Sequence, residues 1–267
     1  MPESCPECEH KTVKQMGVGT EKLANVLQEH FPRAEIARLD RDTSGGKRLQ
    51  RTIRAFRRGD IDVLVGTQMV TKGHDFPSVV TVGVVLADLS LNFPDFRSAE
   101  RTFQLLAQVA GRAGRAENEG RVYVQTYQPD HFSVEAAREH DFEQFATREL
   151  ERRERANYPP RSHLVIIKFE GRNESKCMRA ARDYAGAARK ILRNEAELGK
   201  DVLMLGPAQA PIARLKGKHR LRITFKSRSR KKLRRAVISA LERVGHFELN
   251  RRRDVRIVVD VDPINML

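Results

Sequence analysis

Short apolar runs alternate with amphipathic stretches through the first half of the chain. Five runs have the length and β-branched content of buried strands: 13–16, 36–39, 62–65, 80–87 and 121–126. Three stretches repeat apolar residues at helical spacing: 21–30, 47–58 and 98–110. Strands that alternate with helices in this way indicate an α/β domain, in which helices cover a mostly parallel sheet.

The second half of the chain has a different order. A charged helix is predicted over 132–156, with Phe132, Ala136, Phe142, Phe145 and Leu150 turned inward, and Tyr158-Pro-Pro160 ends it. The pattern then predicts a strand, a helix, two strands, a helix and a strand: 164–169, 177–193, 202–205, 221–225, 231–244 and 255–261. This β-α-β-β-α-β order is typical of ferredoxin-like sandwiches, so we expect a smaller α+β domain here.

Composition narrows the class of protein. The 267 residues provide for two modest domains, and an apolar fraction of 40% is enough for real cores. The chain has no apolar run of about 18 residues and no apolar segment near Met1, so neither a membrane span nor a secretory signal is predicted. Three cysteines without a disulfide framework fit a reducing compartment, and we expect a cytoplasmic protein.

The net charge of +15 is concentrated in the second half. Residues 1–128 carry 18 basic and 16 acidic side chains, whereas residues 129–267 carry 32 and 19. Twelve Lys and Arg and no acid lie between Arg214 and Arg235. Such a patch indicates a nucleic-acid surface, and a solvated basic face is the alternative.

The most informative motif is Gln108-Val-Ala-Gly-Arg-Ala-Gly-Arg115, at the end of a predicted helix. Arg112 and Arg115 stand three residues apart, a spacing that directs both guanidinium groups to one point. A planar, permanently charged guanidinium suits a transferring phosphoryl group. A cationic helix C-terminus with a glycine cap is the alternative interpretation.

A polar loop, Gly66 to Pro77, joins two of the predicted strands, which is where α/β folds bind ligands. Together with the 108–115 segment it resembles motifs V and VI of superfamily 2 helicases. The chain resembles the PriA family of replication-restart helicases, also called primosomal protein N′, in three motifs: Gly66-Thr-Gln-Met, Lys72-Gly-His-Asp-Phe-Pro77 and Pro94-Asp-Phe-Arg97. Matching motifs continue to Asp260-Val-Asp-Pro263, so the resemblance covers nearly the whole chain and the C-terminal part of the family's protein.

The resemblance implies four segments. They are a remnant of a zinc-binding insertion (1–12), the second RecA-like lobe of a helicase motor (13–128), a helical connector (129–160) and a DNA- and protein-binding α+β domain (161–267). It implies part of an ATP-dependent 3′→5′ DNA helicase that restarts stalled forks and assembles primosome proteins on nucleoid DNA. A stand-alone, non-enzymatic module that binds DNA or single-stranded-DNA-binding protein is the alternative. Nothing physical in the motor motifs excludes an RNA helicase lobe.

The resemblance also assigns nucleotide contacts. Arg112 and Arg115 would reach the γ-phosphate of ATP, Gln108 would help to position the hydrolytic machinery, and Gly73 would let backbone approach the nucleotide. Asp75 would accept a hydrogen bond from ribose, or would cap a turn as a structural residue. The chain has neither a G-x-x-x-x-G-K-[ST] segment nor an acidic motif of the D-E-x-H type after a strand, and by resemblance the family carries these ATP and Mg²⁺ groups on the preceding lobe. We therefore expect no ATP turnover from this chain alone.

Short polar groups near strand ends suit contacts to the backbone of single-stranded DNA. Thr67, Gln68 and Lys72 are predicted to contact phosphates there. Gly19 and Thr20 open a predicted helix, where backbone N–H groups bind phosphate. A plain helix cap is the alternative for Thr20, because threonine is a common N-cap residue.

Cys5-Pro-Glu-Cys8 is half of a zinc site, since a structural zinc ion normally takes four protein ligands. A redox or incidental pair is the alternative. The resemblance implies zinc, with partner cysteines upstream, so we expect an incomplete site here. Cys177 falls on an amphipathic helix and is predicted to lie in the core.

The second domain carries the strongest DNA-binding signal. Its basic stretch alternates along a strand, and Lys216, Lys218, Arg220 and Arg222 are predicted to face water and follow a phosphate backbone. By resemblance this domain helps to bind forked DNA and the acidic tail of single-stranded-DNA-binding protein. Arg230 stands where the family places an arginine that contacts this tail, and Arg234 stands where some relatives carry a neutral polar residue.

Overall fold

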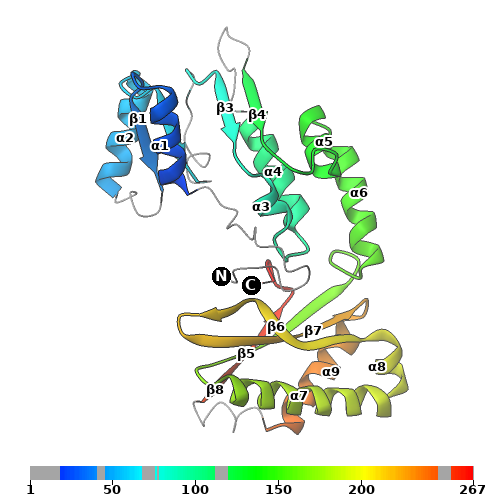
Figure 1. Ribbon diagram of the computed structural model, residues 1–267. Coiled ribbons are helices and arrows are strands. Elements are labelled where there is room, and N and C mark those ends of the chain that lie inside the picture. The colour runs from blue at the N-terminus through cyan, green and yellow to red at the C-terminus, as the bar shows by residue number, and fades with distance from the viewer. Residues whose placement is uncertain are drawn as a thin grey trace, which may run out of the picture. The chain divides into compact units, whose positions relative to one another are not determined.

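The chain forms two compact units in the computed structural model (Figure 1), which describes residues 19–40, 46–67, 76, 78–111, 120–245 and 254–266. The first unit contains Met1–Leu91 and Thr102–His140, and the second contains Asn92–Arg101 and Asp141–Leu267. Helices and parallel strands alternate in the first unit, and helices pack on an antiparallel sheet in the second. The predicted fold class, an α/β lobe followed by a smaller α+β domain, is confirmed.

The elements of the first unit follow the predicted order. They are α1 (Thr20–His30), β1 (Ile36–Leu39), α2 (Gly46–Arg58), β2 (Val63–Gly66), β3 (Thr81–Val84), α3 (Asp88–Leu91), α4 (Ser98–Ala110, entering from the second unit), β4 (Arg121–Val124) and α5 (Phe132–Glu139). Strand β1 pairs in parallel with β2, and β3 pairs in parallel with β4. Within the described residues these are two separate pairs rather than one sheet. The strand predicted over 13–16 lies outside the described residues.

One helix predicted over 132–156 is two helices in the structure. Helix α5 ends at Glu139, because its C-cap His140 has a left-handed φ of 57°, and α6 (Phe142–Arg155) begins after Asp141. The Asp141 side chain accepts a hydrogen bond from the backbone N–H of Gln144, so it caps the new helix. The break changes which residues face inward: Phe132, Ala136 and Phe145 are buried as predicted, whereas Phe142 and Leu150 are exposed.

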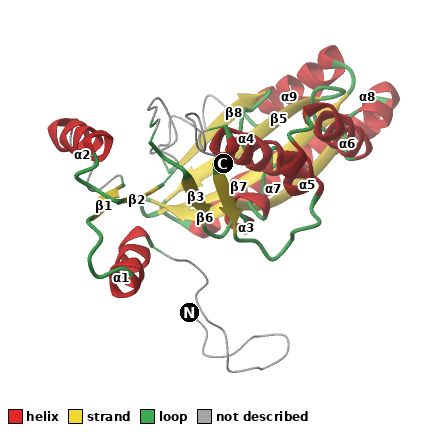
Figure 2. Ribbon diagram, turned by 90° about the horizontal axis from the view of Figure 1, so that it is seen from above, coloured by secondary structure: helices red, strands yellow, loops and turns green. Residues whose placement is uncertain are grey.

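The second unit has the predicted ferredoxin-like order with one extra short helix, α8. After α6 come β5 (His163–Gly171), α7 (Glu174–Asn194), α8 (Ala196–Asp201), β6 (Leu203–Leu215), β7 (Lys218–Ser227), α9 (Arg230–Arg243) and β8 (Val255–Val261). The sheet order is β6-β7-β5-β8, and every neighbouring pair is antiparallel. Helices α7 and α9 cover one face of this sheet (Figures 1 and 2).

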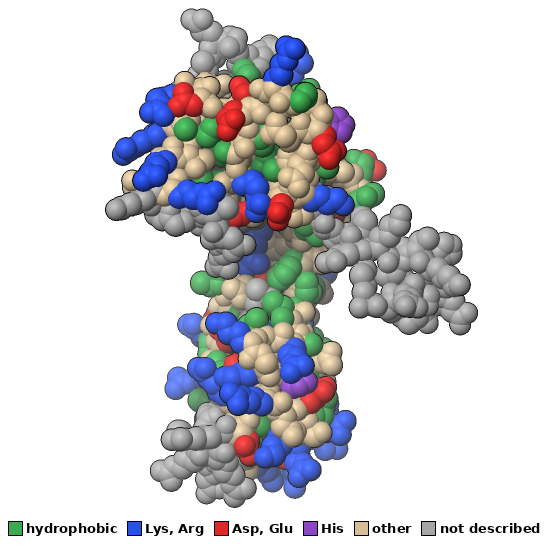
Figure 3. Space-filling model, turned by 60° about the vertical axis from the view of Figure 1, so that its left-hand side comes forward, with side chains coloured by type: hydrophobic (Ala, Val, Ile, Leu, Met, Phe, Trp, Pro, Cys, Tyr) green, Lys and Arg blue, Asp and Glu red, His purple; other side chains and the backbone are tan. Residues whose placement is uncertain are grey.

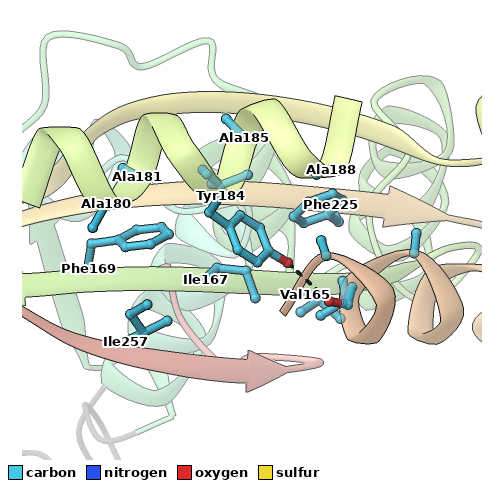
Figure 4. Close-up of a cluster of buried hydrophobic side chains, with 14 of the residues drawn as sticks. Val165, Ile167, Phe169, Ala180, Ala181, Tyr184, Ala185, Ala188, Phe225 and Ile257 are labelled. Carbon is cyan, nitrogen blue, oxygen red and sulfur yellow. Dashed lines mark hydrogen bonds between the residues drawn. The ribbon is translucent and has the colours of Figure 1, made fainter. Parts of the chain in front are cut away.

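Alternate residues of the strands fill the core beneath these helices. Val165, Ile167 and Phe169 of β5 point toward α7 (Figure 4) and are no more than 4% exposed. Tyr184 of α7 is fully buried among them, and its hydroxyl donates to the carbonyl oxygen of Val237 at 3.3 Å. A buried tyrosine keeps this partner because an unpaired hydroxyl is costly. Cys177 is also fully buried, which confirms its predicted core position.

The other sides of β5 and β7 carry a smaller cluster built around Asp95, whose side chain is 0% exposed. Its carboxylate accepts hydrogen bonds from the backbone N–H groups of Arg97 and Met266 and from the guanidinium of Arg101, each at 3.0 Å. Arg101 also donates to the carbonyl oxygen of Ile264 at 3.0 Å. The cluster thereby holds the last described residues of the chain against the segment that begins α4.

Ion pairs between Glu100 and two arginines lie beside this cluster. Glu100 accepts hydrogen bonds from Arg97 at 2.9 Å and from Arg153 at 2.6 Å. The hydrogen bond from Arg97, together with that from Arg153, lowers the pKa of Glu100 to about 2, against the effect of burial. Phe96 stacks on Tyr158, with ring centroids 5.0 Å apart, and Arg153 lies over the Phe96 ring. These contacts anchor Asn92–Arg101 in the second unit.

Candidate nucleic-acid and nucleotide interfaces

Gln108 lies on the last turn of α4 and is half-buried. The helix is fixed by its apolar stripe, because Phe103, Leu106 and Val109 are at most 6% exposed. It ends as the sequence predicts, and the N–H of Gly111 donates to the carbonyl oxygen of Ala107 at 3.0 Å. The other predicted nucleotide contacts, Gly73, Asp75, Arg112 and Arg115, lie outside the described residues and stay predictions.

Two of the residues predicted to contact DNA lie at one edge of the β1-β2 pair. Leu39 pairs with Gly66 in the parallel register, so Asp40 and Thr67, which follow them, lie at the carboxyl ends of both strands. The Thr20 hydroxyl donates to Asp40 at 2.8 Å, which brings the start of α1 to this edge. Thr67 is exposed there, whereas Gln68 and Lys72 lie outside the described residues.

The N-cap of α1 is Gly19 rather than Thr20. Gly19 has extended backbone angles, and Thr20 is the first helical residue. The Thr20 side chain is engaged with Asp40, which also accepts a 2.7 Å hydrogen bond from Arg38. The alternative interpretation of Thr20 as the cap is therefore wrong, and without a side-chain cap the first N–H groups of α1 are the donors that a phosphate would require.

The basic stretch of the second unit forms a hairpin. Leu215 pairs with Lys218, so the turn consists of Lys216 and Gly217, whose φ angles are 49° and 75°. Two residues with positive φ make the turn whose twist matches the flanking strands. Arg214, Lys216 and Lys218 are exposed around this tip, as predicted for the two lysines.

Two of the four predicted phosphate contacts do not face water. Arg220 is 8% exposed, and its Nε donates to Glu170 of β5 at 3.1 Å. Arg222 is half-buried, donates to the carbonyl oxygen of Met266 at 3.1 Å, and has a pKa that is lowered by burial. The prediction of four water-facing cations is wrong for this pair, because β5 and the C-terminal residues cover that part of the strand. The basic surface of the hairpin is limited to its tip.

Helix α9 carries a shallow cavity of about 550 Å³. Four cations surround one exposed apolar side chain, and the lining residues are Arg230, Lys231, Arg234, Arg235, Ile238 and Ser239. Arg230 is 3.4 Å from Asp262, and Ser229 caps the helix by accepting from the N–H of Lys232. Cations around an apolar residue suit a peptide with both carboxylates and a hydrophobic side chain.

The predicted zinc ligands Cys5 and Cys8 lie outside the described residues. Among the residues that the structure does describe, no three His, Cys, Asp or Glu side chains gather in a way that would hold a metal ion. No helix in those same ranges is long and apolar enough to cross a membrane.

Comparison with known proteins accounts for both units. Residues 9–117 match the family model "Helicase conserved C-terminal domain", and residues 154–264 match "Primosomal protein N C-terminal domain". Replication restart protein PriA of Bacillus subtilis is 38% identical over 270 residues, covering 100% of this chain. The chain belongs to the PriA family. The PriA proteins of Treponema pallidum and Synechocystis are 41% and 40% identical over 266 residues, covering 100% and 99% of this chain.

The chain corresponds to a C-terminal portion of PriA proteins. It spans 32%, 39% and 30% of the length of the Bacillus, Treponema and Synechocystis relatives. The helicase match falls on the α/β elements, and the primosomal match falls on the ferredoxin-like unit. The two structural units therefore agree with the two parts that the family models recognise.

Sequence reasoning missed two groups of residues. Asp95 was recognised only as part of the family motif Pro94-Asp-Phe-Arg97, and nothing in the sequence around Asp95 or Arg101 indicates that the end of the chain contacts them. The basic residues on the outer face of α7 recur at helical spacing, a signal that a helical projection of 174–194 would have displayed.

Proposed function

We propose that this chain is the C-terminal part of an ATP-dependent 3′→5′ DNA helicase that acts in the cytoplasm at stalled replication forks. The observation that carries the proposal is the match to replication restart proteins along the whole chain, with helicase motifs in the first unit. In this role the first unit supplies Gln108, Arg112 and Arg115 to ATP and Mg²⁺ bound on a preceding lobe. A guanidinium aimed at the γ-phosphate stabilises charge that develops as the phosphoryl group transfers.

In this proposal both units contact DNA. Thr67 and the start of α1, at the carboxyl edge of β1 and β2, would hold backbone phosphates in the first unit. The hairpin tip would hold phosphates in the second unit. Such contacts position a strand without reading its sequence, which suits an enzyme that acts at any fork.

Replacing Arg214, Lys216 and Lys218 together by Gln should weaken binding of single-stranded DNA equally for unrelated sequences. Each phosphate contact contributes about 0.7 to the slope of log affinity against log salt, so three lost contacts should reduce the slope by about 2. Fluorescence anisotropy over a salt series measures both quantities. The control replaces Arg155, Lys200 and Arg228, three exposed cations elsewhere in this unit, and should change neither. Wild-type affinity and slope in the hairpin variant would show that the tip is only solvated.

The cavity on α9 supports a second partner, the acidic tail of single-stranded-DNA-binding protein. Arg230 at the helix start would pair with a tail carboxylate, and Ile238 would contact an apolar side chain. Arg230→Ala should weaken binding of an acidic peptide that ends in a hydrophobic residue by about tenfold, or about 1.4 kcal/mol. Calorimetric titration measures the affinity, with Arg155→Ala on α6 as the control. Equal affinities for the two variants would exclude Arg230 from the contact.

A further inference from the structure

Helix α7 presents two faces of opposite character. One face packs on the sheet through Cys177, Ala180, Tyr184 and other residues that are at most 8% exposed. The outer face carries six basic residues within one helical stripe: Lys176, Arg179, Arg182, Arg189, Lys190 and Arg193. Asp183 is the one acid on that stripe. At a rise of about 1.5 Å per residue, the row from Lys176 to Arg193 extends over about 26 Å of α7.

Among the residues that the structure describes, few acids neutralise the charge on this stripe. Lys176 pairs with Asp254 at 2.8 Å. Arg189 donates to the carbonyl oxygen of Gly206 at 3.0 Å, which leaves its charge without a carboxylate in the described ranges. Over the same ranges Arg179, Arg182 and Lys190 have neither an ion pair nor a hydrogen bond. By contrast, Arg230, Lys232 and Arg235 on the neighbouring α9 each pair with an acid.

The chemistry of the stripe separates it from the cavity on α9. None of the exposed side chains of α7 in the structure is a large hydrophobic group, whereas the α9 cavity is lined in part by the exposed Ile238. A protein partner normally requires an apolar anchor, and a regular row of cations alone suits a polyanion. Lys and Arg also predominate over acids on much of the second unit that faces the viewer in the lower part of Figure 3.

Gly186 lies at the centre of the stripe and has no structural reason to be glycine. It is exposed in the middle of a long helix, where glycine is among the least favourable residues. A Cβ added there would meet nothing within 4 Å, so neither packing nor backbone geometry excludes a side chain. Because glycine has no side chain, it leaves the helix backbone at this position open to close approach by another molecule.

We propose that the outer face of α7 is a second DNA-binding surface, which contacts the phosphate backbone of duplex DNA with Gly186 at the point of closest approach. A row of about 26 Å along one helix is shorter than one turn of duplex DNA, which is about 34 Å, so the stripe can contact phosphates within a single turn. The contacts are to phosphates and carry no base preference. This inference rests on the proposed function in DNA binding, and it adds a surface on the helical side of the sheet, separate from the hairpin tip.

Two variants of the complete 267-residue chain test the proposal. The first replaces Arg179, Arg182 and Lys190 by Gln, which keeps helix propensity and removes three charges. Affinity for a 24-bp duplex should fall at least about tenfold at low salt, and the slope against log salt should decrease by about 2.7, at 0.9 per contact. The matched control replaces Arg155, Lys200 and Arg228 by Gln and should leave affinity for the duplex unchanged. The same measurements with a 24-nucleotide single strand should show a smaller loss.

The second variant, Gly186→Leu, changes no charge. It should raise the melting temperature, because leucine favours a helix, and it should weaken duplex binding at least about fivefold because the side chain blocks close approach. Thr147→Leu on the exposed side of α6 is the steric control. Gly186→Leu with wild-type affinity for the duplex would overturn the close approach, and an unchanged triple variant would overturn the surface itself. An equal loss for single strands would overturn the assignment to duplex DNA. A wild-type chain that binds no DNA would instead refute the proposed function.

Discussion

Asp95→Ala should lower the free energy of unfolding of the second unit by about 3 kcal/mol, because it leaves a guanidinium and two backbone N–H groups without their shared acceptor. The Asp95 side chain is 0% exposed, and it bonds to Arg97, Arg101 and Met266. Urea denaturation followed by far-UV circular dichroism measures the change, since the chain has no tryptophan. The two units are compact bodies, so the transition of the second unit is the one to compare.

Asp201→Ala is the matched control for this prediction. Asp201 forms an ion pair with Lys232, but its side chain is 46% exposed, and surface pairs of this kind contribute less than about 1 kcal/mol. Hydrogen exchange adds a local measurement. The backbone N–H of Met266 donates a hydrogen bond to Asp95, so it should lose its protection from exchange in Asp95→Ala. Equal destabilisation by the two variants, with Met266 still protected, would show that the Asp95 cluster does not hold the end of the chain.

The sequence was most informative where local pattern decides structure. Helix α4 and strands β1 and β8 have the predicted boundaries. The spacing of apolar residues within each of these segments is enough to indicate a helix or a strand. The break between α5 and α6 was missed because it depends on one left-handed residue, His140, in an otherwise helical pattern. The basic outer face of α7 was also missed, because the sequence analysis predicted the helix from its apolar residues and did not consider which polar residues share its exposed face.

The missed contacts are those that join distant parts of the chain. Asp95 bonds to Met266 across 171 positions, and no local pattern indicates such a pair. Arg220 illustrates the same limit, because strand alternation shows which residues share a face but not that Glu170 of β5 lies opposite. The family resemblance supplied the predicted nucleotide contacts, and of these the structure describes Gln108 alone.

In a helicase that joins this chain to a lobe bearing a P-loop, Arg115→Ala should lower kcat for DNA-stimulated ATP hydrolysis by at least about 10²-fold, with a smaller change in KM. The reason is that a guanidinium at the γ-phosphate stabilises charge that is present mainly in the transition state. Arg112→Ala should act in the same direction. Steady-state kinetics over a range of ATP concentrations separates kcat from KM, and circular dichroism verifies that the variants fold.

Two comparisons make this prediction specific. Arg121→Ala removes an exposed arginine from β4 of the same unit and should leave kcat unchanged. This chain by itself should show no ATP turnover with or without DNA, because its sequence has no P-loop to bind the phosphates. A variant of Arg115 that raises KM at an unchanged kcat would assign this arginine to ground-state binding instead of catalysis. Turnover by the isolated chain that Arg115→Ala abolishes would mean that the nucleotide site lies within these residues after all.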